Sequence, residues 1–224
     1  MVSKSILTAL AAAACAAIAA ALPAIILLFG VPISDPDPAE FAKLHLHPAF
    51  DARVVLTFTY FAAIIALHWF IVPDGGSARR WFLLGFAFFL VGNGIDTVYR
   101  SVQFLLVHGA WAPAVLQAGA ESAAAAARIS AFNEFASSIG FSFAFFFAIG
   151  RLLMGGALIA AGGPLARYCG VAIALNGVWN LATVLSVWPA FSGLSAMGTY
   201  YMWPWLAAIL LAGALGWQKA KAAA

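Results

Sequence analysis

A row of polar side chains interrupts the apolar stretch 81–107. At steps of three, four and three residues come Asn93, Asp96, Arg100 and Gln103. This spacing places all four side chains on one face of a helix, where Asp96 and Arg100 can form an ion pair. A charge at bilayer depth costs at least roughly 2.5–3.5 kcal/mol, so such residues are usually paired, inward-facing or functional. The row is therefore the first candidate for a functional site.

Two later apolar stretches carry polar side chains at comparable depth. Asn133 and Glu134 lie near the start of one stretch, and Asn176 and Asn180 lie four residues apart in the next. Because successive membrane helices run in opposite directions, these positions and the row reach similar depths in a bundle. We therefore expect one polar cluster in the outer half of the membrane, made of Asn93, Asp96, Arg100, Gln103, Asn133, Glu134, Asn176 and Asn180.

Two interpretations of this cluster stay open at the level of sequence. In the first, Asp96 and Glu134 share Arg100 in a buried ion-pair network that locks the helices together. In the second, the cluster is a site open to the outside. Arg100 then holds an anionic or polar ligand, and a carboxylate carries a proton.

The histidines predict neither a metal site nor a haem. His68 and His108 are expected near opposite membrane faces, whereas a haem bound between helices needs two axial ligands at one level. His45 and His47 fall in a polar segment that we interpret as a solvated loop, because a His-x-His pair alone is a weak metal signal. No metal and no cofactor are predicted.

The sequence lacks the common catalytic motifs. It contains no nucleophile elbow, zincin motif, P-loop or dinucleotide fingerprint. We therefore do not expect an enzyme, although an intramembrane enzyme that uses Asp96, Arg100 and Glu134 stays an alternative.

The composition indicates which elements must position these residues. Hydrophobic residues make up 65% of the 224 residues and charged residues 8%, against about 45–50% and about 25% in soluble domains. Six crossings of about 20 residues each use roughly 120 residues and leave only short loops. The sequence thus predicts an all-α, polytopic transmembrane bundle of about six helices, forming a single integral membrane domain over residues 1–224.

The predicted spans are separated by turn signals. The first apolar run is longer than the roughly 7–15-residue apolar core of a signal peptide, so we expect a retained helix. Asp35-Pro36-Asp37-Pro38 is interpreted as a turn that blocks a helix, and residues 108–128 as either an interfacial helix or an early extension of the fourth span. The expected spans are 6–29, 52–72, 81–107, 129–149, 168–187 and 199–216.

The basic residues predict an orientation. With the N-terminus in the cytoplasm, seven of the eleven basic residues lie inside: Lys4, Arg79, Arg80, Arg151, Arg167, Lys219 and Lys221. This positive-inside pattern places both termini in the cytoplasm. The basic residues are scattered near helix ends rather than clustered, so no nucleic-acid partner is expected. The high alanine content indicates a GC-rich bacterial genome and hence a multi-pass protein of the inner (cytoplasmic) membrane.

The preferred function is binding or transport of a small polar or anionic ligand in an outer-facing pocket among the third, fourth and fifth spans. The alternative from a different class is a structural or accessory subunit of a larger membrane complex. Besides the lipid bilayer and such a ligand, a second copy of the chain or a larger complex is the expected partner.

Overall fold

The described part of the chain is built from helices. The computed structural model describes residues 4–29, 37–117, 119–186, 189–200 and 202–222. Its elements are α1 (Lys4–Phe29), α2 (Pro38–His45), α3 (Pro48–Phe70), α4 (Gly76–Val102), the π-helix η1 (Gln103–Trp111), α5 (Ala112–Leu116), α6 (Ala120–Ala161), α7 (Pro164–Leu185), the 3-10 helix η2 (Pro189–Tyr200) and α8 (Met202–Ala222). The all-α prediction is confirmed for these ranges.

Within the described residues, three helical stretches are long and apolar enough to cross a membrane. They cover Lys4–Ala24, Gly76–Leu116 and Glu121–Ala161, and the apolar stretch Val55–Phe70 is shorter. Mean hydropathy in the most apolar part of each long stretch lies between 1.5 and 2.2. The structure thus agrees with the prediction of a membrane protein.

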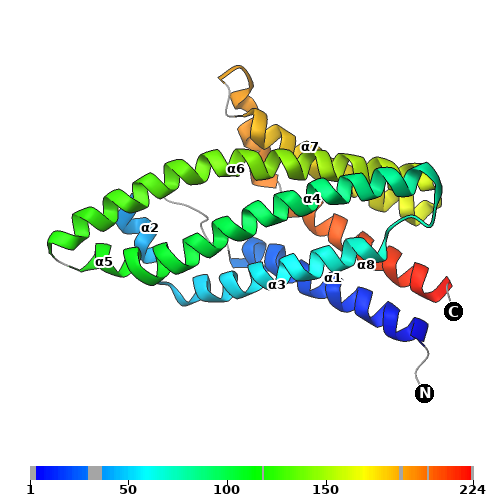
Figure 1. Ribbon diagram of the computed structural model, residues 1–224, viewed down its shortest axis with the longest axis horizontal. Coiled ribbons are helices and arrows are strands. Elements are labelled where there is room, and N and C mark those ends of the chain that lie inside the picture. Colours follow the sequence, from blue (N-terminus) through cyan, green and yellow to red (C-terminus); the bar gives the residue numbers. More distant parts are fainter. Residues whose placement is uncertain (1–3, 30–36, 118, 187–188, 201, 223–224) are drawn as a thin grey trace.

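Two of these helical stretches are much longer than their neighbours. The stretch Gly76–Leu116 has 41 residues and α6 has 42, whereas α7 has 22. At 1.5 Å per residue the long helices measure about 62 Å and α7 about 33 Å, close to the roughly 30 Å of a hydrocarbon core. These two stretches, Gly76–Leu116 and α6, are called the long pair, and they extend well past the rest of the bundle (Figure 1). The helical stretch Gly76–Leu116 continues past the predicted span end at 107 and α6 continues past the one at 149, and residues 120–128 belong to α6.

A small group of helices forms the extended end, which we call the cap: α2, η1, α5 and the first part of α6, residues 120–136. The predicted turn Asp35-Pro36-Asp37-Pro38 ends where α2 begins, and this helix is capped by Asp37. Its side chain accepts a hydrogen bond from the Ala39 amide at 2.7 Å, and Pro38 occupies the first helical position. Residues 30–36 lie outside the described part of the chain.

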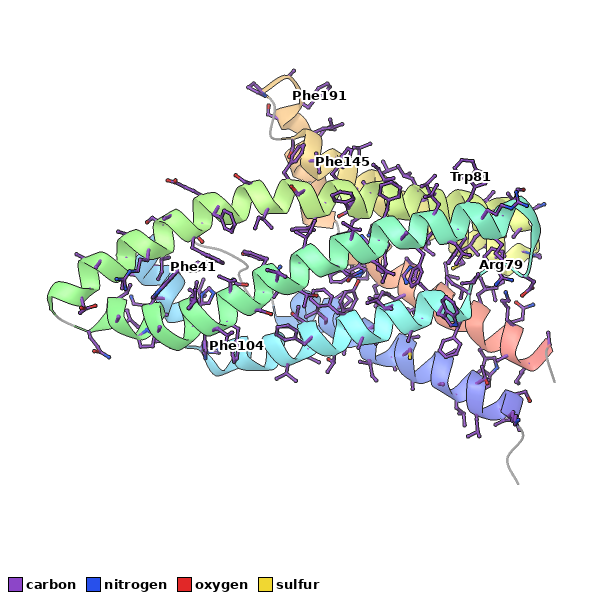
Figure 2. All side chains as sticks on the ribbon, in the orientation of Figure 1. Phe41, Arg79, Trp81, Phe104, Phe145 and Phe191 are labelled. Carbon is purple, nitrogen blue, oxygen red and sulfur yellow. The ribbon has the colours of Figure 1, made fainter. Side chains whose placement is uncertain are left out.

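The cap has its own apolar core. Phe41 and Ala42 of α2 are buried against Val107, Ala112, Ile129 and Phe132. Tyr99 stacks on Phe132 with ring centroids 5.5 Å apart and connects this core to α4. Figure 2 shows Phe41 within the cap and Arg79 and Trp81 at the opposite end of the molecule. Apolar burial therefore holds α2 over the end of α4.

Glycines bring α4 and α7 close to α6. A Cβ added at Gly85 would lie 2.6 Å from the Gly150 carbonyl oxygen, and one added at Gly155 would lie 2.6 Å from the Gly170 carbonyl oxygen. Backbones this close are typical of small-residue packing between membrane helices. The two contacts use different faces of α6, so α4 and α7 both pack on α6 and enclose the strip between those faces.

The main core lies at the end of the molecule away from the cap. Its largest fully buried side chains come from α3, α4, α6, α7 and α8 and include Leu67, Phe82, Phe89, Met154, Leu158, Ile173 and Ile209. The start of α1, the end of α8 and the turns after α3 and α6 all lie at this end (Figure 1). The cap and the two chain ends are thus on opposite sides of the bundle.

Candidate functional site in the helical bundle

The row predicted on the third span lies on a buried face of α4 and η1. Asn93 is 2% exposed, Asp96 8% and Gln103 4%, and the Arg100 side chain is 23% exposed. The spacing of three and four residues continues the apolar face made by Phe82, Phe86 and Phe89. Polar groups therefore replace apolar ones along a single buried stripe as α4 approaches the cap.

A chain of hydrogen bonds connects this stripe to α2. His45 donates from Nδ1 to the Phe41 carbonyl oxygen at 2.9 Å, which leaves its Nε2 as an acceptor. Gln103 donates from Nε2 to that nitrogen at 3.1 Å, and its Oε1 accepts from Arg100 Nη1 at 2.9 Å. The donor and acceptor roles are consistent from one link to the next, so Arg100 is tied to the cap through Gln103 and His45.

Arg100 has further partners on α4. Its Nε lies 3.3 Å from Asp96 Oδ1, an ion pair whose atoms lack hydrogen-bond geometry. The guanidinium also lies 4.9 Å from the centre of the Tyr99 ring, which itself packs on Phe132. Aromatic and ionic contacts together hold the Arg100 side chain beneath the cap.

The two candidates on α6 differ in position. Asn133 is half-buried, whereas Glu134 is exposed and is not among the contacts of Arg100. Glu134 follows the buried Phe132 by two residues, a rotation of about 200° around the helix. The structure therefore places Glu134 apart from the Asp96–Arg100 pair.

The two candidates on α7 are buried but do not lie beside Arg100. Asn176 is 1% exposed and Asn180 5%, and Asn180 donates from Nδ2 to the Asn176 carbonyl oxygen at 2.8 Å. Because α7 packs on α6 and α8 rather than along α4, these residues face a different part of the bundle. They belong to a second polar site near the middle of the molecule.

Arg151 is the basic residue of this second site. It is 4% exposed, and its guanidinium carbon lies 4.8 Å from the Phe147 ring centre and 5.7 Å from that of Phe89. Arg151, which the charge pattern placed among the basic residues of the inner side, lies within α6, because this helix continues ten residues further to Ala161. That length is about 15 Å, half the thickness of a hydrocarbon core.

His68, Arg151 and Asn176 line one small cavity. His68 is 4% exposed, donates from Nδ1 to the Ile64 carbonyl oxygen at 2.7 Å, and has its ring centre 4.6 Å from that of Phe89. We call His68, Arg151 and Asn176 the central site. They line a cavity of about 10 Å³, which is roughly the space of one water. Its apolar walls are Ile64, Ile173, Trp205, Ala208 and Ile209.

Two side-chain amide atoms near these sites lack a hydrogen-bond partner. Asn93 donates to the Phe89 carbonyl oxygen at 3.0 Å, but its Oδ1 is buried and unpaired. The Nδ2 of Asn176 is also buried and unpaired. Since nearly all buried polar groups in proteins have a partner, these two atoms are exceptions among the buried side chains of the described residues.

Sequence reasoning missed Arg151 and His68 as site residues. The signal for Arg151 was the absence of a helix breaker before Gly162-Gly163-Pro164, which implies that the arginine lies within a helix and not at its end. No comparable signal exists for His68, which is only two residues from the end of α3. Its ring is buried because of the tertiary packing against Phe89.

A larger pocket lies at the end of the bundle that holds the chain ends. It measures about 380 Å³ and is formed by the turns after α3 and α6 and by the end of α8. Lys219 Nζ lies 2.8 Å from Asp74 Oδ1 at this pocket and also donates to the Val72 carbonyl oxygen. Arg100 is not part of its lining.

Within the described ranges, no three His, Cys, Asp or Glu residues are grouped as metal ligands. The segment of His45 and His47 is not the expected loop. His45 ends α2, and His108 donates from Nδ1 to its carbonyl oxygen. On the exposed face of α2, the hydrogen bond to Glu40 raises the pKa of Lys43.

No protein-family model matches this chain, and no curated protein or solved structure shows significant similarity to it.

Proposed function

We propose that the chain crosses the bacterial inner membrane six times, with both termini in the cytoplasm. Six helices, α1, α3, α4, α6, α7 and α8, run alternately between the two ends of the bundle (Figure 1). With Arg151 removed from the count, the basic residues near the end that holds the chain termini are Lys4, Arg79, Arg80, Arg167, Lys219 and Lys221. This asymmetry supports a cytoplasmic location for that end and places the cap outside.

We further propose that the bundle binds, and in turn transports, a small polar or anionic ligand. Two arginines mark the ends of a buried polar path, with Arg100 beneath the cap and Arg151 in the central site. The observation that carries the proposal is the unpaired Asn176 amide at a cavity shared with a buried arginine. A network that only locked helices together would satisfy its own donors and acceptors.

Access from the outside requires a change at the cap. Arg100 is covered by α2 through the His45–Gln103 contact. An anionic ligand that reaches Arg100 replaces Gln103 as the hydrogen-bond acceptor. It also competes with the Asp96 carboxylate for the Arg100 guanidinium. In this proposal α2 is the element that separates, since it has eight residues and is attached mainly through Phe41 and Ala42.

Thermal denaturation of the detergent-purified chain with a panel of small anions and polar solutes tests this proposal. A ligand that binds only the folded state raises the free energy of unfolding by about 2.7 kcal/mol at a hundredfold excess over its Kd. We expect such a shift in the wild type, its loss in Arg100→Gln, and its retention in Arg128→Gln. Arg128 is an exposed arginine on α6, so its variant removes the same charge away from the path.

A second function is supported by a different observation. Leu105, Leu106 and Phe135 are 66%, 43% and 58% exposed on the cap, at a height where lipid does not cover them in the proposed topology. Such a surface favours an accessory subunit that packs against a larger complex. Absence of any ligand shift, together with severe destabilisation of Arg100→Gln, would contradict the binding proposal and support this one. The intramembrane-enzyme alternative has less support, because Glu134 is exposed on α6 and Arg100 instead contacts Asp96 and Gln103.

A further inference from the structure

We propose that the pocket at the end of the bundle with the chain ends binds the phosphate headgroup of an anionic phospholipid. The pocket measures about 380 Å³ and is formed by the turns after α3 and α6 and by the end of α8. This volume falls in the range of small-molecule sites, roughly 300–1,000 Å³. The inference rests on the membrane crossing in the proposed function, but not on a ligand at Arg100.

Lys219 supplies the positive charge that a phosphate needs at this pocket. Its side chain is 25% exposed, and its ammonium donates to the Val72 carbonyl oxygen, which fixes the ammonium in place. The ammonium also lies 2.8 Å from Asp74 Oδ1, but the Asp74 side chain is 93% exposed. Because an ion pair with so exposed a partner is weak, a doubly hydrogen-bonding phosphate replaces the Asp74 carboxylate at Lys219.

The surroundings of the pocket carry a surplus of positive charge. The segments 71–80, 158–168 and 215–222 hold one acidic residue, Asp74, against five basic residues: Arg79, Arg80, Arg167, Lys219 and Lys221. Figure 2 shows Arg79 at this end of the molecule. Basic residues beside a membrane attract anionic lipids. Lys219 adds a contact within the pocket to this general attraction.

Exposed aromatic side chains place the pocket at the depth of lipid headgroups. Trp69, Trp81 and Tyr168 are 63%, 54% and 67% exposed. Each is at most five residues from the end of its helix at the pocket, or about 8 Å along the helix axis. Exposed Trp and Tyr are typical of the boundary between hydrocarbon and headgroups. This depth favours a phospholipid over a free phosphate compound as the ligand.

The remaining walls of the pocket favour a headgroup with hydroxyl groups over one with a cation. Gln218 is exposed beside Lys219 and offers both amide donors and an acceptor. Among the described residues that line the pocket, Asp74 is the one acidic residue, and it is already paired with Lys219. The glycerol headgroup of phosphatidylglycerol therefore fits this pocket better than the quaternary ammonium of phosphatidylcholine.

The test is thermal denaturation of the full chain in detergent micelles that contain phosphatidylglycerol or phosphatidylcholine. We expect phosphatidylglycerol to raise the denaturation temperature by about 5 °C or more at a hundredfold excess over its Kd. Phosphatidylcholine and soluble glycerol 3-phosphate should have no such effect. Equal shifts with the two lipids would overturn the inference. An equal shift with glycerol 3-phosphate would overturn the lipid as the source of the phosphate.

Two lysines of α8 provide a matched pair of variants. Lys219→Gln should abolish the difference between the two lipids, and Lys221→Gln should keep it. Both variants lose one positive charge, but Lys221 is not among the residues of the pocket, and its ammonium lies 5.0 Å from the centre of the Trp217 ring. Each variant is compared with itself in the two lipids, so a change in its basal stability does not affect the result. Equal losses in both variants would show general charge attraction and overturn the site.

Asp74→Asn tests the same site without removing the lysine. This variant loses the carboxylate that competes for Lys219, so the concentration of phosphatidylglycerol at half of the full shift should fall severalfold. An unchanged concentration would contradict the replacement of Asp74 by phosphate.

Failure of this inference is distinguishable from failure of the proposed function. Arg100→Gln should keep the phosphatidylglycerol effect, and Lys219→Gln should keep any shift caused by a small polar ligand. A small-ligand shift without a lipid effect contradicts this inference alone. A lipid effect without any small-ligand shift supports the pocket and contradicts ligand binding at Arg100.

Discussion

Several buried polar side chains hydrogen-bond to their own helix. In each case the acceptor is the carbonyl oxygen four residues earlier, and the side chains are those of His45, His68, Asn93 and Asn180. Such a bond satisfies one end of the side chain and fixes its rotamer. The other end is then directed to a neighbouring helix or a cavity. His45 uses its free nitrogen to reach Gln103, which connects α2 to η1.

The Asp96–Arg100 pair is expected to contribute to stability, whereas Glu134 is not. The two side chains of the pair are 12% and 23% exposed, so Asp96→Asn leaves a partly buried guanidinium without its counter-charge. We expect this substitution to lower the free energy of unfolding by about 1–3 kcal/mol, between the values for exposed and buried pairs. Chemical denaturation in detergent measures the loss.

Glu134→Gln is the matched control for that measurement. It also removes one carboxylate, but from an exposed position on α6, so the free energy of unfolding should stay within about 0.5 kcal/mol of the wild type. Equal losses in the two variants would show that Glu134 also interacts with Arg100, as the sequence suggested.

At the scale of elements, α6 organises the bundle. Its contacts with α4 include Gly150 and Met154, and its contacts with α7 include Gly155 and Ile159. Residues three or four apart lie on the same side of a helix. Arg151 precedes Met154 of the α4-facing side by three residues and Gly155 of the α7-facing side by four, so it lies between the two sides. Close packing on both sides therefore forces this side chain into the interior, where it meets His68 of α3.

Two adjacent glycines of α6 provide a sharp test of this packing. A Cβ at Gly155 would lie 2.6 Å from the Gly170 carbonyl oxygen, whereas a Cβ at Gly156 meets nothing within 4 Å. Gly155→Ala should lower the free energy of unfolding by about 1–3 kcal/mol through overpacking. Gly156→Ala should leave it unchanged or raise it by up to about 1 kcal/mol through helix propensity. Similar effects in thermal denaturation would contradict the close approach of α6 and α7.

At the scale of the whole molecule, the difference in helix length has a consequence for topology. The long pair exceeds α7 by nearly twofold, and its extra length carries the cap. If the shorter helices match the bilayer, the cap stands outside it, and the polar path leads from the cap to the middle of the membrane. Accessibility at the two ends of the bundle therefore tests the proposed orientation.

Single cysteines report which side each end occupies. In a background with Cys15→Ala and Cys169→Ala, the positions are Gln117→Cys after α5 and Ser77→Cys at the start of α4, both exposed. In intact spheroplasts a membrane-impermeant maleimide should label Gln117→Cys only. Ser77→Cys should react only after the membrane is opened. Labelling of both from the same side would contradict the six-span topology, and the reverse pattern would invert it.

The sequence determined the class of the protein and part of the site. Long apolar runs have one stable solution in a bilayer, the helix, because no water is present to satisfy backbone groups. Periodicity of three and four residues also predicted that the row on α4 shares a face, because that relation depends on helix geometry alone. Asn93, Asp96 and Gln103 are indeed all buried on α4 and η1.

Packing between helices determines which polar residues lie together. His68, Arg151 and Asn176 are distant in sequence, and they meet because glycine contacts set how α4 and α7 pack on α6. The same packing leaves Glu134 exposed although its expected depth matched that of Arg100. Depth in the membrane follows from counting residues along a helix. The direction in which a side chain faces depends on contacts with helices that the local sequence does not specify.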